Sequence, residues 1–249
     1  HIVRLRGVSS AAGENGAGSG RFFLVLDRIR CTLEERIGEW EIRSRPIHSP
    51  MSAIYYSENV RNIIRTLTEE RLSAAYGIAS AMKYIHGKKI IYRDLKPQNI
   101  GFDARGRIKL FDFGLARDLT AAPASGDKFL LTGMTGTLRY MAPEVFKEEP
   151  YTFSADVYSF GIVMWYAYAL RVPFSGYSCA MYRRLVVGGG KRPLADLSAW
   201  GATVCDLLGA CWDPDPGARP SFAEVCGVLA AHEAFGRGAA AVSPRGTFA

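Results

Sequence analysis

The pattern of apolar and polar residues predicts two short strands at the start of the chain. Residues 2–8 alternate weakly between apolar and polar positions, and residues 21–29 contain a continuous apolar run of strand length. Between them, residues 9–20 are almost all Ser, Ala, Gly, Glu and Asn, which bring too little apolar surface to order a segment. We therefore expect two strands joined by a flexible Gly/Ser-rich loop.

Helical spacing dominates the chain after these strands. Thr32 and Glu35 form the pattern of a capping box, which predicts a short helix over residues 33–40. Apolar residues at helical spacing predict a long helix over residues 68–87. Residues 43–65 contain two prolines and are interpreted as an irregular insertion. Further helices are expected at residues 154–170, 178–187, 197–211 and 221–234.

Short β-like segments are expected between the long helix and the later helices, at residues 89–92, 100–102 and 108–111. The turn sequence of residues 103–106 predicts that the last two form a hairpin. The expected fold class is therefore α+β, with a mainly α-helical body and a small β-hairpin region.

Composition and charge narrow the possible functions. The longest uninterrupted apolar run has eleven residues (160–170), whereas a membrane-spanning helix needs about 17–25, so no membrane insertion is expected. The net charge of +7 comes from scattered basic residues, which argues against a nucleic-acid partner. Five cysteines without a C-x-x-C pair indicate reduced thiols, and the expected localisation is cytoplasmic.

Candidate chemistry gathers around the predicted hairpin, at Asp94, Lys96, Asn99 and Asp112. Two carboxylates and an amide oxygen are hard ligands suited to Mg²⁺, and a lysine beside them suggests a phosphate. A carboxylate that does not bind the metal could accept a proton from a hydroxyl. Each residue alone is typical of a turn or a helix cap, but together they favour magnesium-dependent phosphate chemistry.

Five motifs around these residues resemble those of protein kinases in their order and spacing. They are IYRDLKPQN at residues 91–99, DFG at 112–114, APE at 142–144, DVYSFG at 156–161, and CW with RPSF within 211–222. The resemblance covers residues 1–235 and implies a protein kinase-like fold. Lys96, the sequence GTLRYM at 136–141 and the helical end resemble Ser/Thr kinases of the tyrosine-kinase-like group.

The reaction implied by the resemblance is transfer of the γ-phosphate of ATP, with Mg²⁺, to Ser or Thr hydroxyls of protein substrates. Asp94 would accept the proton of the substrate hydroxyl, and Lys96 would contact the γ-phosphate. Asn99 and Asp112 would hold the magnesium ions.

Adenine would bind at the hinge of residues 27–29, through Asp27 and Ile29, behind Leu26 at the gatekeeper position. Gly101 stands where most kinases place a large aliphatic residue under the adenine ring, which implies weaker nucleotide binding.

The resemblance also assigns structural roles. The residues concerned are Tyr92 and Phe113 in a hydrophobic column below Leu5, Thr137 beside the catalytic Asp and Lys, Asp156 under the catalytic loop, and Glu144 paired with Arg219.

A regulatory switch is expected in the activation segment, residues 112–144. Arg93 and Arg117 would lie as unpaired positive charges near the catalytic loop. A phosphate on Thr132 or Thr135, added by an upstream activating kinase, would join them and order the segment.

The sequence departs from the family at its start. The chain begins at His1 without a signal-peptide pattern, so we expect an expressed piece or a natural fragment of something longer. No G-x-G-x-x-G loop occurs in it, and the lysine that would grip the α- and β-phosphates is also missing, so this chain alone is expected to be inactive. A non-catalytic kinase-like scaffold or binding module is the alternative.

The expected domain division follows from the motifs. Residues 1–29 would be the remnant of the N-lobe, with two strands, the loop 9–20 and the hinge. Residues 30–235 would be the C-lobe, which contains the insertion and the activation segment, and residues 236–249 would be a disordered tail.

Overall fold

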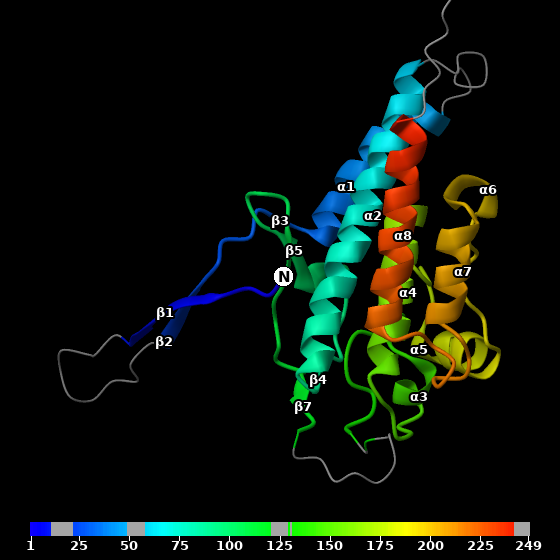
Figure 1. The fold of residues 1–249 in the computed structure, drawn as a ribbon. Coiled ribbons are helices and arrows are strands. Elements are labelled where there is room, and N and C mark those ends of the chain that lie inside the picture. The colour runs from blue at the N-terminus through cyan, green and yellow to red at the C-terminus, as the bar shows by residue number, and fades with distance from the viewer. Residues whose placement is uncertain (11–21, 49–57, 121–128, 130, 242–249) are drawn as a thin grey trace, which may run out of the picture.

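The helical body is built around α4 (Ser154–Ala169), whose residues are apolar on nearly every side. A helix without a polar face is stable only when other elements cover it all round. α2 (Glu58–Gly87) and α7 (Ala202–Cys211) pack against α4, and α8 (Phe222–Ala241) packs along α2 (Figure 1). The computed structural model describes residues 1–10, 22–48, 58–120, 129 and 131–241.

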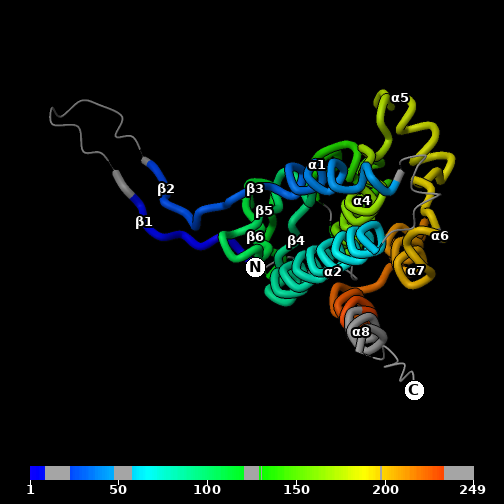
Figure 2. The backbone as a smooth tube through the Cα atoms, turned by 90° about the horizontal axis from the view of Figure 1, so that it is seen from above, coloured from blue at the N-terminus to red at the C-terminus, as the bar shows by residue number. Residues whose placement is uncertain are grey.

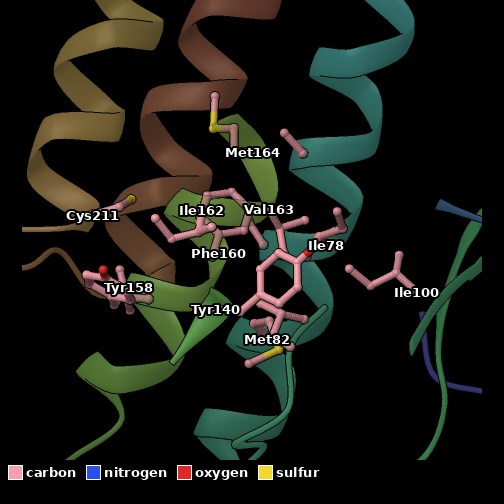
Figure 3. Packing of buried hydrophobic residues seen from close by; sticks show 14 of the residues in the cluster. Ile78, Met82, Ile100, Tyr140, Tyr158, Phe160, Ile162, Val163, Met164 and Cys211 are labelled. Carbon is pink, nitrogen blue, oxygen red and sulfur yellow. The ribbon is translucent and has the colours of Figure 1, made fainter. Parts of the chain in front are cut away.

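The hydrophobic core lies between α4 and its neighbours. Phe160 and Val163 of α4 lie beside Ile78 and Met82 of α2, with Tyr140 in the same cluster (Figure 3). Each fully buried side chain of this size contributes about 1.5–3 kcal/mol of burial free energy. This packing fixes the position of α4, and with it the position of its first turn.

Short elements surround this core. β3 (Cys31–Thr32), β5 (Ile100–Phe102) and β6 (Ile108–Leu110) form an antiparallel sheet, and β4 (Ile90–Ile91) pairs with β7 (Arg117–Asp118). The predicted hairpin of β5 and β6 is confirmed. The remaining short elements are 3₁₀ helices at Arg45–His48, Pro97–Asn99 and Leu138–Tyr140, α3 (Pro143–Phe146), α5 (Cys179–Met181), the π-helix η5 (Tyr182–Gly188) and α6 (Leu197–Trp200).

The predicted capping box starts α1 (Leu33–Ser44), with Thr32 and Glu35 bonding each other's backbone N–H groups. The helix is one turn longer than the prediction. Trp40 is buried and donates its ring N–H to Glu70 of α2 at 2.7 Å, and Arg43 also binds Glu70. These contacts to α2 hold the last turn.

The prediction of an irregular insertion at residues 43–65 is wrong at both ends of that segment. Residues 43 and 44 belong to α1, and α2 begins at Glu58, ten residues before the predicted start. Val60 and Leu67 are buried on the stripe that continues along α2, which explains the longer helix. Residues 49–57 lie outside the described residues.

The C-terminal helices also differ from the prediction. Gly201 adopts φ of 78°, which favours glycine, and it divides the helix predicted at residues 197–211 into α6 and α7. α8 continues to Ala241, so residues 236–241 of the predicted tail are helical, and residues 242–249 lie outside the described residues. No helix among the described residues is both long and apolar enough to cross a membrane.

The two predicted N-terminal strands are present as β1 (Leu5–Ser10) and β2 (Phe22–Leu26), which pair antiparallel. They form a hairpin that reaches away from the helical body (Figure 1). Leu5 is 56% exposed and Leu26 is 45% exposed. The loop predicted over residues 9–20 lies outside the described residues apart from the strand residues 9 and 10.

Polar contacts and a few backbone bonds attach this hairpin to the body. The backbone of His1 and Val3 bonds Leu110 of β6, which adds a bridge to the small sheet. Asp27 accepts hydrogen bonds from Lys109 of β6 at 3.1 Å and from Arg6 at 2.6 Å. The bond from Lys109 is the main cause that lowers the pKa of Asp27 to about 2. The charged Asp27 therefore stabilises the attachment above its ordinary pKa of 3.8, and the contribution is lost as the pH falls toward 2.

We predict that Lys109→Met loosens the hairpin at neutral pH. The substitution removes the ammonium that pairs with Asp27 and keeps an apolar stem in the buried position. Hydrogen–deuterium exchange of the β1 and β2 amides is expected to become several-fold faster, whereas exchange in α2 stays unchanged. Lys88→Met, which removes an exposed lysine, is the matched control. Equal exchange in β1 and β2 for wild type and Lys109→Met would contradict the attachment.

Candidate active site

The loop of residues 92–99 is held by the buried carboxylate of Asp156 in the first turn of α4. One oxygen of Asp156 accepts the N–H of Tyr92 and the other accepts the N–H of Arg93, each at 2.8 Å. Arg93 has φ of 68°, an unfavourable backbone conformation for a residue with a Cβ atom. The two bonds therefore fix the backbone of the loop directly before Asp94.

His86 is a residue of this arrangement that the sequence did not indicate. It lies at the end of α2, and its Nε2 is 2.8 Å from an oxygen of Asp156. Its ring packs against Phe153 and Phe222. A histidine at a helix end gives no local signal of such a contact, because its partner lies 70 positions away in the sequence.

Asp94 lies at the centre of a hydrogen-bonded group. Its Oδ2 accepts bonds from Lys96 Nζ at 2.6 Å and from Asn99 Nδ2 at 2.9 Å, and its Oδ1 accepts the hydroxyl of Thr137 at 3.1 Å. Lys96 also donates to the Thr137 hydroxyl. The structure thus brings together four of the residues that the sequence singled out, with the Asp94 carboxylate oriented through both oxygens.

Gly136 permits the close approach of Thr137 to this group, a role that its sequence context did not indicate. Gly136 has φ of 104°, and a Cβ atom at this position would come within 2.6 Å of the Arg93 carbonyl oxygen. A glycine directly before the threonine is therefore required where the activation segment crosses the catalytic loop.

Tyr92 and Phe113 pack edge to face, with ring centroids 5.1 Å apart. The Tyr92 hydroxyl donates to the carbonyl of Phe111. Burial and then the negative charges of Asp94 and Asp112 raise the pKa of Tyr92, which keeps the hydroxyl protonated as a donor. Leu5, expected above these rings, is instead exposed on the projecting hairpin. The prediction that Leu5 belongs to the hydrophobic column is therefore wrong.

Asp112 and Asn99 are the candidate magnesium ligands. Asp112 is exposed, and its Oδ1 accepts the N–H of Gly114 at 3.3 Å. Asn99 directs its amide N–H groups to Asp94, so its side-chain oxygen is the end available to a cation. The described residues contain no group of three His, Cys, Asp or Glu side chains suited to a metal. This donor set fits Mg²⁺ because this ion commonly uses one or two protein oxygens together with phosphate oxygens and water.

The hinge of residues 27–29 has backbone groups that remain available for hydrogen bonds. Among the described residues, no hydrogen bond engages the carbonyl of Asp27 or the N–H of Ile29, whereas the N–H of Asp27 donates to Arg4. The space beside Gly101 is filled by Ile29 and Phe111, since a Cβ atom there would meet Ile29 at 2.5 Å. The apolar surface missing at residue 101 is thus supplied by two neighbours.

Glu144 and Arg219 form a buried ion pair. Two nitrogens of Arg219 bind the two carboxylate oxygens of Glu144 at 2.6 and 3.0 Å. Arg219 also donates to the carbonyls of Asp213 and Ser154, so most of its donors have partners. The pair joins the end of the activation segment to the loop before α8.

The candidate regulatory residues are only partly brought together. The Arg93 guanidinium donates to the Leu115 carbonyl at 2.6 Å and to the Thr132 hydroxyl at 3.0 Å. The Thr135 hydroxyl donates to the Thr132 carbonyl within the same turn. Arg117 is exposed on β7, where it pairs with Ile91 of β4, two residues before Arg93. No hydrogen bond or ion pair among the described residues joins it to Arg93, and its part in the switch stays a prediction.

Comparisons with known proteins agree with the motifs. The family described as Protein kinase domain matches residues 52–228. Serine/threonine-protein kinase STY17 of Arabidopsis thaliana is 37% identical over 158 residues, which are 64% of this chain and 26% of that protein. From the same organism, serine/threonine/tyrosine-protein kinase HT1 is 36% identical over 161 residues, 65% of this chain and 40% of that protein. Serine/threonine-protein kinase CTR1 is 36% identical over 161 residues, 64% of this chain and 19% of that protein. The chain therefore spans less than half the length of these relatives.

We predict that Glu144→Ala destabilises the helical body by about 3–5 kcal/mol, because it leaves the buried Arg219 charge without its partner. Thermal or urea unfolding of Glu144→Ala, Arg219→Ala and the double variant measures the coupling. The double variant is expected to lose less stability than the sum of the two single losses. Strictly additive losses would show that the two side chains do not stabilise each other.

Proposed function

The chain belongs to the protein kinase domain family, and from this premise we propose that it supplies the catalytic loop of a Ser/Thr protein kinase. The reaction proposed is transfer of the γ-phosphoryl group of Mg-ATP to a Ser or Thr hydroxyl of a protein. The observation that carries this proposal is the hydrogen-bonded group of Asp94, Lys96, Asn99 and Thr137.

Asp94 is the proposed base. Its carboxylate is oriented by Thr137 on one oxygen and by Lys96 and Asn99 on the other, so it can orient the substrate hydroxyl and accept its proton. The Lys96 ammonium would bind the γ-phosphate and stabilise the negative charge on the phosphoryl oxygens during transfer.

Asn99 and Asp112 are the proposed magnesium-binding residues, each through a side-chain oxygen. Bound magnesium would neutralise charge on the ATP phosphates. The left-handed backbone of Asp112, with φ of 59°, and the bond to Gly114 orient this carboxylate in the loop after β6.

The hinge is the proposed adenine site. The carbonyl of Asp27 and the N–H of Ile29 would bind the polar edge of the base, and Ile29 and Phe111 would provide apolar surface beside Gly101. Because these groups lie where the hairpin joins the body, the position of the nucleotide depends on how firmly that hairpin is held.

The 249 residues alone are proposed to transfer phosphate poorly or not at all. They contain Asp94 and both magnesium-binding residues, but no glycine-rich phosphate loop. Phosphoryl transfer depends almost wholly on positioning and charge stabilisation, so groups that cover the phosphates are needed.

A non-catalytic binding module is the second candidate function. The observation that favours it is the row of exposed apolar side chains on the hairpin, which includes Leu5, Val8, Phe23, Leu24, Val25 and Leu26. A phosphate-transfer measurement on a longer polypeptide separates the two functions, because a binding module would show no transfer.

We predict that Asp94→Asn lowers kcat by about 10²–10⁴ in a polypeptide that contains these residues together with a glycine-rich loop and its lysine. ATP affinity should change little, because the amide keeps the size of the carboxylate but cannot accept the proton. Radiolabelled phosphate transfer to a generic substrate gives kcat, and calorimetry gives the ATP affinity. Asp112→Ala is the companion variant that should weaken magnesium-dependent ATP binding. Near-normal turnover of Asp94→Asn would exclude it as the base.

We further propose that phosphorylation of the activation segment switches the enzyme. Arg93 is buried and has neutral partners only, and no carboxylate of the described residues pairs with it. A phosphate at Thr132 would meet this charge directly, since the Thr132 hydroxyl already lies 3.0 Å from the guanidinium. Thr132 is therefore the favoured site over Thr135.

We predict that Thr132→Ala lowers the activity of the activated longer polypeptide by about tenfold or more, because the charge-assisted bonds to Arg93 are lost. Thr135→Ala, the control in the same turn, should keep most of the activity. Phosphopeptide mapping should find phosphate on Thr132. Full activity of a Thr132→Ala/Thr135→Ala variant with no phosphate in residues 112–144 would refute the switch.

A further inference from the structure

A stretch of the chain without acidic residues forms an exposed basic face beside the activation segment. Residues 157–195 contain five Arg or Lys residues and no Asp or Glu. Arg183 and Arg184 of η5, together with Lys191, are exposed, and these three residues are called the basic face. None of them forms an ion pair with a residue that the structure describes.

The other two basic residues of this stretch have partners within the protein. Arg192 donates to the carbonyls of Trp212, Val186 and Lys191 and therefore acts as a structural residue. Arg171 interacts electrostatically with Asp196. The unpaired charge is thus concentrated on the basic face.

Aromatic rings hold two of the three charges in place. The Arg183 guanidinium lies 5.4 Å from the ring centroid of Phe146, and the Lys191 ammonium lies 6.0 Å from that of Tyr177. Such contacts restrict long side chains before a partner binds, so less entropy is lost on binding.

η5 is joined directly to the end of the activation segment. The Tyr182 hydroxyl donates to the carbonyl of Met141 at 2.8 Å, and its ring packs against Phe146 of α3. Met141 follows Thr137, which binds Asp94, by four residues. α5, which leads into η5, lies near α3 in Figure 1 and at the outer edge of the body in Figure 2. A protein chain that places a hydroxyl at Asp94 and continues past Met141 would reach the basic face.

We propose that the basic face binds an acidic segment of the protein substrate. This inference rests on the proposed kinase function and adds to it the chemical class of the substrate. Carboxylates of Asp or Glu on the substrate would pair with Arg183, Arg184 and Lys191, which have no acidic partner within the described protein.

The surroundings favour an acidic protein over other anions. A single-stranded nucleic acid needs exposed rings on which bases stack, but Phe146 is buried and Tyr177 is half-buried, each under a cation. A membrane surface needs several exposed apolar side chains on the same face, whereas the described exposed large hydrophobic residues between residues 177 and 195 are Met181 and Leu194 alone.

The test measures peptide binding to the 249-residue chain by fluorescence anisotropy. The probes are a labelled peptide with one serine and a run of glutamates, and the same peptide with glutamines. We expect the glutamate peptide to bind more tightly, and Arg183→Ser/Arg184→Ser to weaken its binding by about tenfold. The matched control, Lys83→Ser/Lys88→Ser, removes the same charge from the last turns of α2 and the residue that follows it, and should change the affinity by less than about twofold.

Three outcomes would overturn the proposal. They are equal binding of the two peptides, equal losses in the two double variants, and arginine-dependent binding of phosphatidylserine vesicles without binding of the glutamate peptide. The binding measurement needs neither ATP nor phosphate transfer. If a longer polypeptide prefers the glutamate peptide but transfers no phosphate, the proposed function alone is contradicted. If it transfers phosphate but binds the two peptides equally, the proposed role of the basic face alone is contradicted.

Discussion

The buried carboxylate of Asp156 is the interaction on which the geometry of the catalytic loop depends. It is 1% exposed, and such a charge is tolerated only when hydrogen bonds replace the water it has lost. The N–H groups of Tyr92 and Arg93 and the ring of His86 supply these bonds, so the end of α2 and the loop converge on the first turn of α4. The same bonds hold Arg93 at a positive φ, which costs about 1–2 kcal/mol for a residue with a Cβ atom. Loss of this carboxylate would release the loop and leave buried donors without partners.

α4 also holds the end of the activation segment, again through buried polar contacts. The Ser159 hydroxyl of α4 donates to the carbonyl of Tyr140 at 2.7 Å, and Arg219 binds both Glu144 and the carbonyl of Ser154 at the start of α4. The activation segment is therefore anchored at its end to the helix that also anchors the catalytic loop. One apolar helix, covered on every side, sets the relative positions of Asp94, the proposed base, and of the chain segment beside which a substrate would lie.

The parts of the fold that the sequence predicted are those specified by nearby residues. The capping box at Thr32, the β5–β6 hairpin and the catalytic-loop motif each depend on residue types within a few positions. Other features depend on distant contacts, since His86 joins the site through a partner 70 positions away. The start of α2 at Glu58 is a different case, because its first turns continue an apolar stripe that is visible in the sequence and that the prediction missed. Leu5 is exposed because no described element covers the hairpin, a property that no local pattern encodes.

The two halves of the proposed nucleotide site are held by different forces. The group around Asp94 is attached to a close-packed core, whereas the hinge is attached to β6 through the Asp27–Lys109 contact and a few backbone bonds. Charged contacts that are partly open to water contribute less than burial of large apolar side chains. The catalytic loop should therefore keep its geometry when the hairpin moves, and the distance between adenine and Asp94 should vary with the hairpin. In such an architecture the helical body holds the group around Asp94 in place, and the contacts of the apolar hairpin would set how the proposed adenine site lies relative to that group.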